Sequence, residues 1–223
     1  MTRSNKPNLA LFDFDGTLTT TDTYSTFIKR ILNSSPYTAK TIWRKLCVIP
    51  VLFCYKLGLI SATHARVKSS FIVLKGLSTS TVEETALQYV DDLFPHIIRP
   101  EIYECLQLHK QQNDTVVIVS ASLDVYLKVW CKRNNLKLLC SQLETAHLNT
   151  NDEIYTGEYL GADCCGEEKA RRIQQHFPLH QYNTIYAYGD TPEDYPMLSL
   201  AHHHVYQGNN LNRIKSLISS KLS

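Results

Sequence analysis

The sequence predicts an α/β fold in three layers, in which helices cover both faces of a parallel sheet and a helical cap subdomain is inserted. Short apolar runs alternate with helical patterns, which is typical of parallel strands joined by helices. The three clearest runs are Asn8–Asp13, Thr115–Ser120 and Thr184–Gly189. Each run delivers polar side chains at its carboxyl end, and a long helical interval separates the first run from the second.

The other core elements are predicted from the same patterns. Two weaker strand candidates, Leu136–Ser141 and His203–Gln207, would extend the sheet. Helical patterns lie between the apolar runs. These predicted helices are Glu101–Gln112, Leu123–Asn134, Gly166–His176 and Leu211–Ser220.

The interval Thr21–Leu93 contains no good strand and is predicted to be helical, with breaks near Pro36, Pro50, Gly58 and Gly76. A helical block between the first strand and the rest of an α/β fold indicates an inserted cap. We therefore divide the chain into a core of residues 1–20 and 94–223 and a cap of residues 21–93.

The apolar stretch Leu46–Ile60 is the only segment worth testing as a membrane span. It is too short to cross a bilayer, and Pro50, Lys56 and Gly58 interrupt it, so no integral span is predicted. The favoured interpretation is a helix that packs inside its own helical bundle. In the alternative, which stays open, residues 52, 53 and 57 are exposed and contact lipid.

Composition excludes several classes of protein. The 223 residues carry 23 basic and 21 acidic side chains, a net charge of +2, which argues against a dedicated nucleic-acid binder. Seven cysteines at irregular spacing do not form a disulfide framework and are expected to be free thiols in the cytoplasm. The short polar N-terminus does not predict a secretion signal. Oligomeric state cannot be predicted.

Polar groups from three strands are expected to meet at one edge of the sheet. In an open parallel sheet, ligands bind outside the carboxyl ends of the strands. The groups at those ends are Asp13 and Asp15, then Ser120 and Ser122, then Asp190 and Asp194. Side chains that are far apart in sequence therefore converge on one crevice.

This set of groups suits phosphoryl transfer assisted by Mg²⁺. Carboxylate oxygens are the ligands that Mg²⁺ prefers, and the ion can neutralise phosphate so that the carboxylate of Asp13 approaches and attacks. Asp15 is placed to donate a proton to the leaving oxygen and later to accept one from water. Lys169 and the Ser120 hydroxyl are candidates for stabilising the charged phosphoryl oxygens.

Four segments together resemble the motifs of the haloacid dehalogenase superfamily. The first is Phe12–Thr19 (FDFDGTLT), the second Val117–Ser122 (VIVSAS), the third Cys165–Ile173 (CGEEKARRI) and the fourth Ala187–Leu198 (AYGDTPEDYPML). Their order and spacing admit a cap between the first two, which makes the combination far more specific than any single motif. The match covers essentially the whole chain and points to subfamily IB, the phosphoserine phosphatase-like group with a Rossmann-like core and a helical cap.

The resemblance implies a role for each matching residue. Asp13 is expected to be the nucleophile and Asp15 the general acid and base, while Ser120 and Lys169 hold the transferring phosphoryl group. Further substrate contacts are expected from Gly16, Thr17, Asp22, Ala121 and Ser122. Mg²⁺ would be held by Asp13, the backbone carbonyl of Asp15 and Asp190, and Asp194 would orient Lys169 or a metal-bound water.

Three departures leave the substrate open. Phosphoserine phosphatases carry a Glu where this chain has Asp22, an Arg where the cap aligns Ser70, and usually an Asn in place of Glu193. Arg66 or Lys68 could compensate one turn away from Ser70. The expected substrate is a small phosphorylated metabolite such as phosphoserine or a relative.

Two alternatives remain. Because some members of subfamily IB resemble phosphatidylglycerophosphatases, a lipid phosphatase with peripheral membrane contact is the first alternative. The second is a phosphate-binding protein without turnover, which the intact catalytic positions disfavour.

Overall fold

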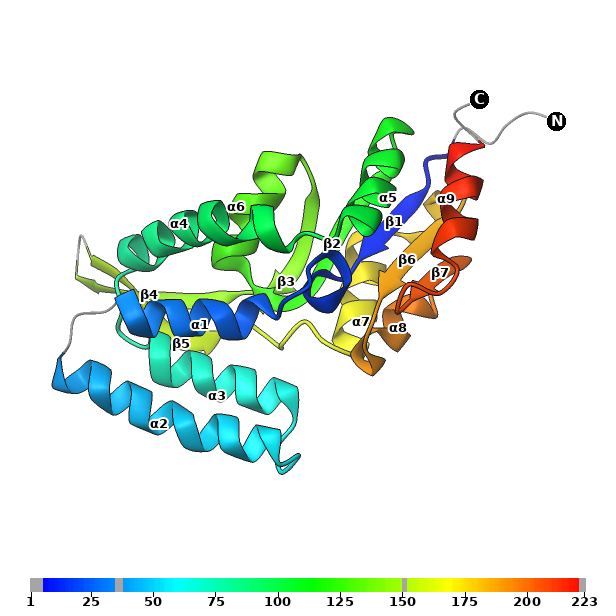
Figure 1. Cartoon of the computed structure of the whole chain (residues 1–223). Helices are drawn as coiled ribbons and strands as arrows, with labels where there is room; N and C mark the ends of the chain where they lie inside the picture. The colour runs from blue at the N-terminus through cyan, green and yellow to red at the C-terminus, as the bar shows by residue number, and fades with distance from the viewer. Residues whose placement is uncertain (1–5, 35–37, 150–151, 221–223) are drawn as a thin grey trace.

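The computed structural model describes residues 6–34, 38–149 and 152–220 (Figure 1). Seven strands and nine α-helices are found in these ranges. The strands are β1 (Leu9–Phe12), β2 (Thr115–Leu123), β3 (Lys137–Ser141), β4 (Leu143–Asn149), β5 (Asp152–Tyr159), β6 (Ile185–Gly189) and β7 (His203–Tyr206). The helices are α1 (Thr23–Ser34), α2 (Ala39–Lys56), α3 (Ala62–Leu74), α4 (Thr79–Ile97), α5 (Pro100–Gln111), α6 (Asp124–Asn134), α7 (Glu167–His176), α8 (Tyr195–Leu198) and α9 (Leu211–Ser219).

Five strands form one parallel sheet in the order β3-β2-β1-β6-β7. The central strand β1 pairs with β2 on one side and with β6 on the other, so that Phe12 lies between Ile118 and Tyr188. All five predicted strands and the four predicted core helices are confirmed, with small differences at their ends.

Alternate residues of the sheet face two separate cores, as the pleat requires. Ala10 and Phe12 of β1 belong to the cluster that α5, α6 and α9 cover. Leu9 and Leu11 belong to a second cluster, which α7 and α8 cover. The predicted three-layer α/β core is therefore confirmed.

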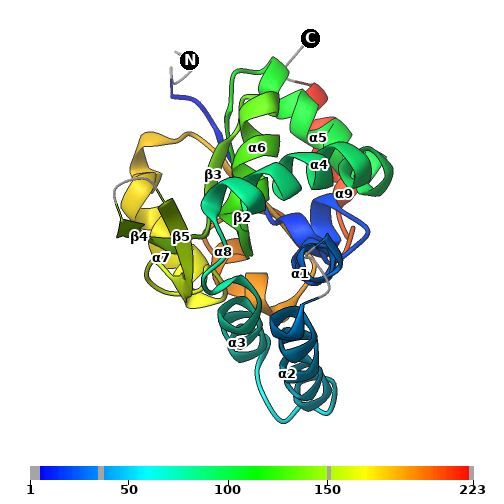
Figure 2. The ribbon, with the colours of Figure 1, turned by 90° about the vertical axis from the view of Figure 1, so that its left-hand side faces the viewer.

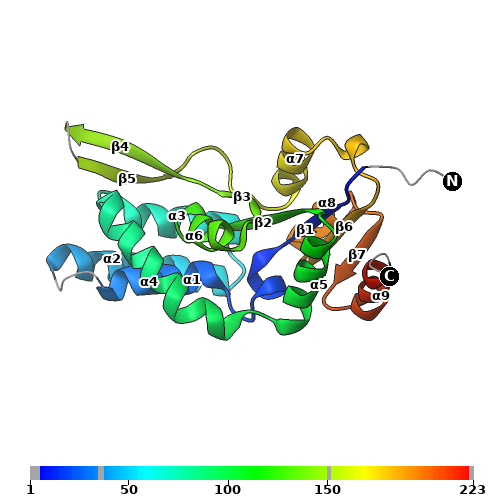
Figure 3. The same ribbon diagram turned by 90° about the horizontal axis from the view of Figure 1, so that it is seen from above.

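The helices α1 to α3 lie beyond one end of the sheet, and the start of β1 and helix α9 lie toward the opposite end (Figures 1 and 2). The hairpin β4–β5, which the sequence analysis did not predict, projects from the core alongside α3 (Figure 3). Backbone hydrogen bonds join the two: Gly76 N–H donates to the carbonyl of Tyr155, and Tyr155 N–H donates to that of Leu77. The hairpin thus anchors the helical insertion to the core.

One predicted helix break is wrong and two are confirmed. Pro50 lies inside α2 rather than at its end. Because Pro50 is exposed, the carbonyl that loses its helical partner there can be hydrated. Gly58 and Gly76 do lie between helices, each with positive φ, whereas the break expected near Pro36 falls outside the described residues.

The expected burial of the apolar stretch Leu46–Ile60 is also wrong. Most of its large apolar side chains are exposed because α2 packs through its other side, on which Thr41, Arg44 and Val48 are buried. Across the described ranges, no helix is both long and apolar enough to cross a membrane. All seven cysteines are free thiols, as expected.

Candidate active site

The carboxyl ends of β1, β2 and β6 open into a pocket of about 480 Å³. Nine of the predicted site residues line it: Asp13, Asp15, Gly16, Asp22, Ser120, Ala121, Ser122, Lys169 and Asp190. Thr17 and Asp194 lie behind this wall, each in contact with a lining residue. The helical insertion supplies most of the remaining lining, and Thr20, Thr191, Pro192 and Glu193 of the core complete it, so the pocket lies between insertion and core.

A buried lysine joins two buried carboxylates at the floor of the pocket. The Lys169 ammonium lies 2.6 Å from Asp13 Oδ1 and 2.6 Å from Asp194 Oδ1. Burial raises the pKa of Asp13 well above its usual value, and Lys169 opposes that effect. For Asp194, burial is outweighed by Lys169 and by the backbone N–H groups of Thr191 and Asp190, so its pKa is lowered. The two carboxylates therefore differ in basicity although they share one cation.

Asp15 is half-buried, two residues after Asp13, and accepts hydrogen bonds on both oxygens. Its Oδ1 accepts from the Thr23 backbone N–H at 2.7 Å and from the Thr23 hydroxyl at 2.5 Å, and its Oδ2 accepts from the Ser122 hydroxyl. Burial raises the pKa of Asp15, with these donors opposing the rise. Thr23 was not predicted as a site residue, because a threonine at a helix start carries no specific signal.

The turn after Asp15 requires a glycine and orients Asp190. Gly16 has φ of +81°, and a Cβ at this position would lie 2.3 Å from Asp190 Oδ2. The Thr17 hydroxyl then donates to Asp190 Oδ1 at 2.9 Å. Only glycine therefore allows β1 and β6 to bring their acidic residues this close together.

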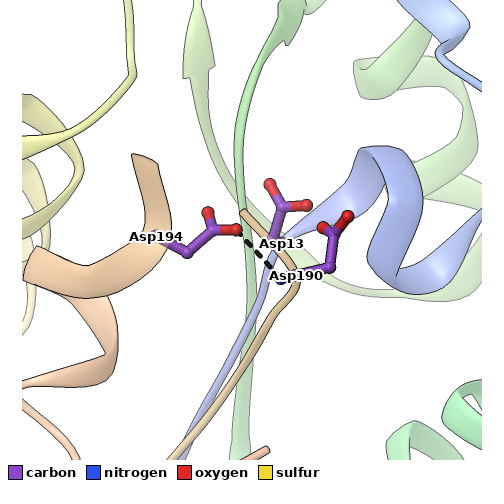
Figure 4. A group of neighbouring side chains, drawn as sticks. All are labelled: Asp13, Asp190 and Asp194. Atoms are coloured by element: carbon purple, nitrogen blue, oxygen red, sulfur yellow. Dashed lines mark hydrogen bonds between the residues drawn. The ribbon is translucent and has the colours of Figure 1, made fainter. Parts of the chain in front are cut away.

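Carboxylate oxygens of Asp13, Asp190 and Asp194 lie within 4.8 Å of one another (Figure 4). An all-oxygen donor set with this much negative charge fits Mg²⁺. Asp194 has little capacity left for a metal, because Oδ1 accepts from Lys169 and Oδ2 accepts from the N–H groups of Asp190 and Thr191. Asp13 and Asp190 are the better-placed ligands of the three.

Ser120 and Ser122 come from the end of β2 and are both buried. The Ser122 backbone N–H donates to Ser120 Oγ at 3.0 Å, which fixes the hydroxyl of Ser120 at the pocket wall. Ala121 lies between them on the lining. This segment offers a hydroxyl and backbone groups toward the place where a phosphoryl group would lie.

Asp22 is exposed at the pocket mouth and has a structural role besides any contact with substrate. Its Oδ1 accepts from the Ser25 backbone N–H at 3.1 Å and its Oδ2 from the Ser25 hydroxyl at 2.6 Å. These are the bonds by which an acidic side chain stabilises the start of a helix. Asp22 therefore stabilises the start of α1 and places its carboxyl group at the pocket mouth.

Arg66, which could compensate for the cap arginine that this chain lacks, contacts Glu193, one of the three departures from the phosphoserine phosphatase pattern. The Arg66 guanidinium lies 2.7 Å from Asp163 Oδ2 and 3.3 Å from Glu193 Oε2. Arg66 belongs to α3, whereas the two carboxylates belong to the core, so these ion pairs join insertion and core at the pocket. Asp163 was missed, because no motif of the sequence includes it.

Ser69 was also missed, and its environment suggests a ligand contact. This residue lines the pocket and is 1% exposed. Among the described residues, its hydroxyl is the one buried side-chain group without a hydrogen-bond partner. Nearby, the Tyr24 hydroxyl lies 2.9 Å from Ser70 Oγ, so Ser70 is already satisfied. A buried hydroxyl without a partner costs free energy unless a bound molecule or water satisfies it.

The fold and this acidic pocket indicate a hydrolase. The family model of haloacid dehalogenase-like hydrolases matches residues 10–199. The chain therefore belongs to the haloacid dehalogenase-like hydrolase family.

Two curated relatives are similar over most of their length. Protein CicA of Caulobacter vibrioides is 27% identical over 199 residues, which cover 88% of this chain and 84% of CicA. A histidinol-phosphatase of Neisseria meningitidis serogroup C is 26% identical over 207 residues, covering 86% of each chain.

Solved structures share the fold at lower identity. A protein from Bordetella pertussis Tohama I has a TM-score of 0.77 at 18% identity and covers 96% of this chain and 97% of its own. A phosphoserine phosphatase with a phospho-aspartyl intermediate analogue has a TM-score of 0.60 at 19% identity, covering 94% of this chain and 91% of its own. The predicted phosphoserine phosphatase-like fold is thus confirmed.

Proposed function

We propose that this chain is a Mg²⁺-dependent phosphomonoester hydrolase that forms an aspartyl phosphate on Asp13. The observation that carries the proposal is the buried group in which Lys169 lies 2.6 Å from both Asp13 and Asp194 while Asp190 lies beside them. Three carboxylates and one ammonium leave net negative charge, which a divalent cation would compensate. Bound to Asp13, Asp190 and the Asp15 carbonyl, Mg²⁺ would supply positive charge to the phosphoryl oxygens.

The proposed reaction has two steps, in which these side chains have different roles. In the first, an oxygen of Asp13 attacks phosphorus and the bond to the ester oxygen breaks, while Asp15 gives its proton to that oxygen. In the second, Asp15 accepts a proton from water, the water oxygen attacks phosphorus, and phosphate leaves Asp13. Lys169 and the Ser120 hydroxyl hold the phosphoryl oxygens in both steps.

The proposal is tested by phosphate release from a broad panel of phosphate esters, with Mg²⁺ and with chelator. Phosphoserine, histidinol phosphate and phosphatidylglycerophosphate in detergent belong in that panel. We expect release that depends on Mg²⁺. If folded protein that binds Mg²⁺ hydrolyses none of them, the phosphate-binding alternative without turnover replaces the proposal.

Replacing Asp15 by Asn should lower turnover by about 10²–10⁴-fold, because both proton transfers lose their donor and acceptor. The first step should suffer less with p-nitrophenyl phosphate, whose leaving group needs no proton. A burst of one nitrophenolate per active site, followed by slow turnover, is therefore expected in rapid-mixing experiments. Equal loss on alkyl and nitrophenyl esters without a burst would contradict this role for Asp15.

Replacing Ser69 by Ala should raise KM for the best substrate by roughly 5–20-fold and leave kcat nearly unchanged, because one neutral hydrogen bond to substrate is lost. Thermal stability should not fall, since the wild-type hydroxyl has no protein partner to lose. The control is Ser70→Ala, which removes a hydroxyl that Tyr24 already contacts. A stability loss in the Ser69 variant without a KM change would assign Ser69 to the scaffold.

A lipid phosphate is the second candidate substrate, and one observation favours it. Leu52 and Tyr55 of α2 line the pocket on the insertion side and are 45% and 47% exposed. An apolar wall of this kind could accept the acyl part of a phosphate ester. Faster hydrolysis of phosphatidylglycerophosphate than of any small ester in the panel would select this candidate.

A further inference from the structure

One face of α2 presents apolar side chains to solvent along its whole length. Ile42, Leu46, Ile49 and Phe53 recur at four- and three-residue spacing, which places them on one side of a helix. Together with their neighbours they form the outer face, which we define as Ile42, Trp43, Leu46, Ile49, Phe53 and Leu57. These side chains are between 51% and 68% exposed. A contiguous apolar surface of this kind marks an interaction site.

The packing of α2 fixes this orientation. Arg44, on the opposite side of the helix, is 7% exposed and donates to the Lys75 carbonyl at 2.6 Å. Thr41 and Val48 are buried on the same inner side. A basic residue is therefore turned inward while the leucines and aromatic residues of the same helix are turned outward. If burial of apolar surface alone had oriented this helix, its apolar side chains would face inward and Arg44 would face solvent.

Charge is distributed very unevenly along the chain, and the segment that contains α2 is purely basic. Residues 23–82, which include α1, α2 and α3, contain nine Lys and Arg and no Asp or Glu. The rest of the chain holds fourteen basic and twenty-one acidic residues. Arg30 and Arg66 pair with acidic residues of the remaining chain. Five lysines of the segment are exposed: Lys29, Lys40, Lys56, Lys68 and Lys75.

Helix α2 also reaches the catalytic pocket, through side chains that are not part of the outer face. Helix α2 lies at the edge of the molecule away from α9 and the start of β1 (Figures 1 and 2). Leu52 and Tyr55 of the same helix line the pocket. A partner bound along α2 would therefore lie beside the pocket.

We propose that the outer face of α2 docks on an anionic lipid surface, with the helix lying in the plane of the interface. An interfacial helix combines an apolar side that enters the lipid boundary with basic residues that attract anionic headgroups, and both are found here. A second copy of this chain would also cover apolar surface. Two segments that each carry nine basic and no acidic residues would repel each other, however, so charge selects the anionic lipid.

Vesicle binding by the full chain tests the proposal, whatever ester the pocket hydrolyses. The protein should cosediment with vesicles that contain phosphatidylglycerol, bind far less to phosphatidylcholine alone, and dissociate at high salt. Trp43 is 68% exposed whereas Trp130, the other tryptophan, is 6% exposed. A blue shift of tryptophan emission on binding would therefore report Trp43 entering the lipid boundary.

Paired variants separate the apolar and the electrostatic contributions. Ile49→Glu with Phe53→Glu should lower vesicle affinity at least ~10-fold, whereas Leu87→Glu with Leu160→Glu, at exposed positions away from α2, should not. Lys40→Gln with Lys56→Gln should lower affinity about 25-fold, at about fivefold for each lysine. Lys132→Gln with Lys137→Gln is the matched control, because both lysines are exposed on other elements.

Three results would overturn the proposal. The first is absence of binding to anionic vesicles at low salt, and the second is equal binding to neutral and anionic vesicles. The third is a dimer, detected by light scattering, that the Ile49→Glu and Phe53→Glu variant converts to monomer although the wild type does not bind vesicles. Hydrolysis of a soluble ester by the same variants should stay unchanged. This readout separates a failure of the docking surface from a failure of the proposed chemistry.

Discussion

Replacing Asp13 by Asn should lower phosphate release at least ~10⁴-fold, because an amide cannot form the acyl phosphate on which the proposed reaction depends. The protein should still fold. Asn has nearly the same shape as Asp, and Lys169 retains its 2.6 Å contact with Asp194. Burial already raises the pKa of Asp13, so removing its charge also removes a desolvation cost. Steady-state phosphate release with Mg²⁺ and thermal unfolding are the two measurements.

The control for this variant is Asp22→Asn, which changes another carboxylate that lines the same pocket. Asp22 is exposed and bonded to Ser25, so its loss should weaken substrate binding or the start of α1 without stopping the chemistry. We expect the kcat of the Asp22→Asn variant to decrease by less than about tenfold. If the Asp13→Asn variant keeps more than a few per cent of wild-type turnover, the proposed aspartyl-phosphate intermediate on Asp13 is wrong.

The core of this protein could be predicted from its sequence because the motif residues stand at the ends of the apolar runs that predict the strands. Asp13, Ser120 and Asp190 each follow a short apolar run, so one pattern located both the sheet and the chemistry. The hairpin β4–β5 could not be predicted in the same way. Its stability depends on distant backbone partners, such as Tyr155 with Leu77, which sequence spacing does not reveal.

The contacts around the pocket that the sequence did not reveal depend on how the chain folds and not on a local motif. Thr23, Ser69, Asp163 and Arg66 matter through partners, or through the lack of one, that only the folded chain defines. The exposed face of α2 was misjudged because apolar character was taken as a sign of burial. The absence of acidic residues between positions 23 and 82 was visible in the sequence and would have indicated a surface segment.

Replacing Lys169 by Met should reduce both turnover and stability. Turnover should fall about 10²–10³-fold, because a positive charge beside the phosphoryl group is lost. Without Mg²⁺, the free energy of unfolding should fall by about 3–5 kcal/mol, because two buried carboxylates lose their shared cation. The control is Lys128→Met. The Lys128 side chain is 62% exposed, so its ion pair with the largely buried Asp124 is partly solvated and should contribute only about 1 kcal/mol.

The pH and Mg²⁺ dependence of the Lys169→Met variant distinguish this explanation from a simple packing defect. Lys169 lowers the pKa of Asp13, so its removal should raise that pKa further above the unfolded value. A carboxyl with a raised folded pKa contributes its stability below the unfolded pKa and loses it as pH rises. The variant should therefore approach wild-type stability in acid and lose stability toward neutral pH. Mg²⁺ should raise its melting temperature more than it raises that of the wild type, because the ion replaces the missing charge. A stability loss that is independent of pH and of Mg²⁺ would show that Lys169 acts through packing alone.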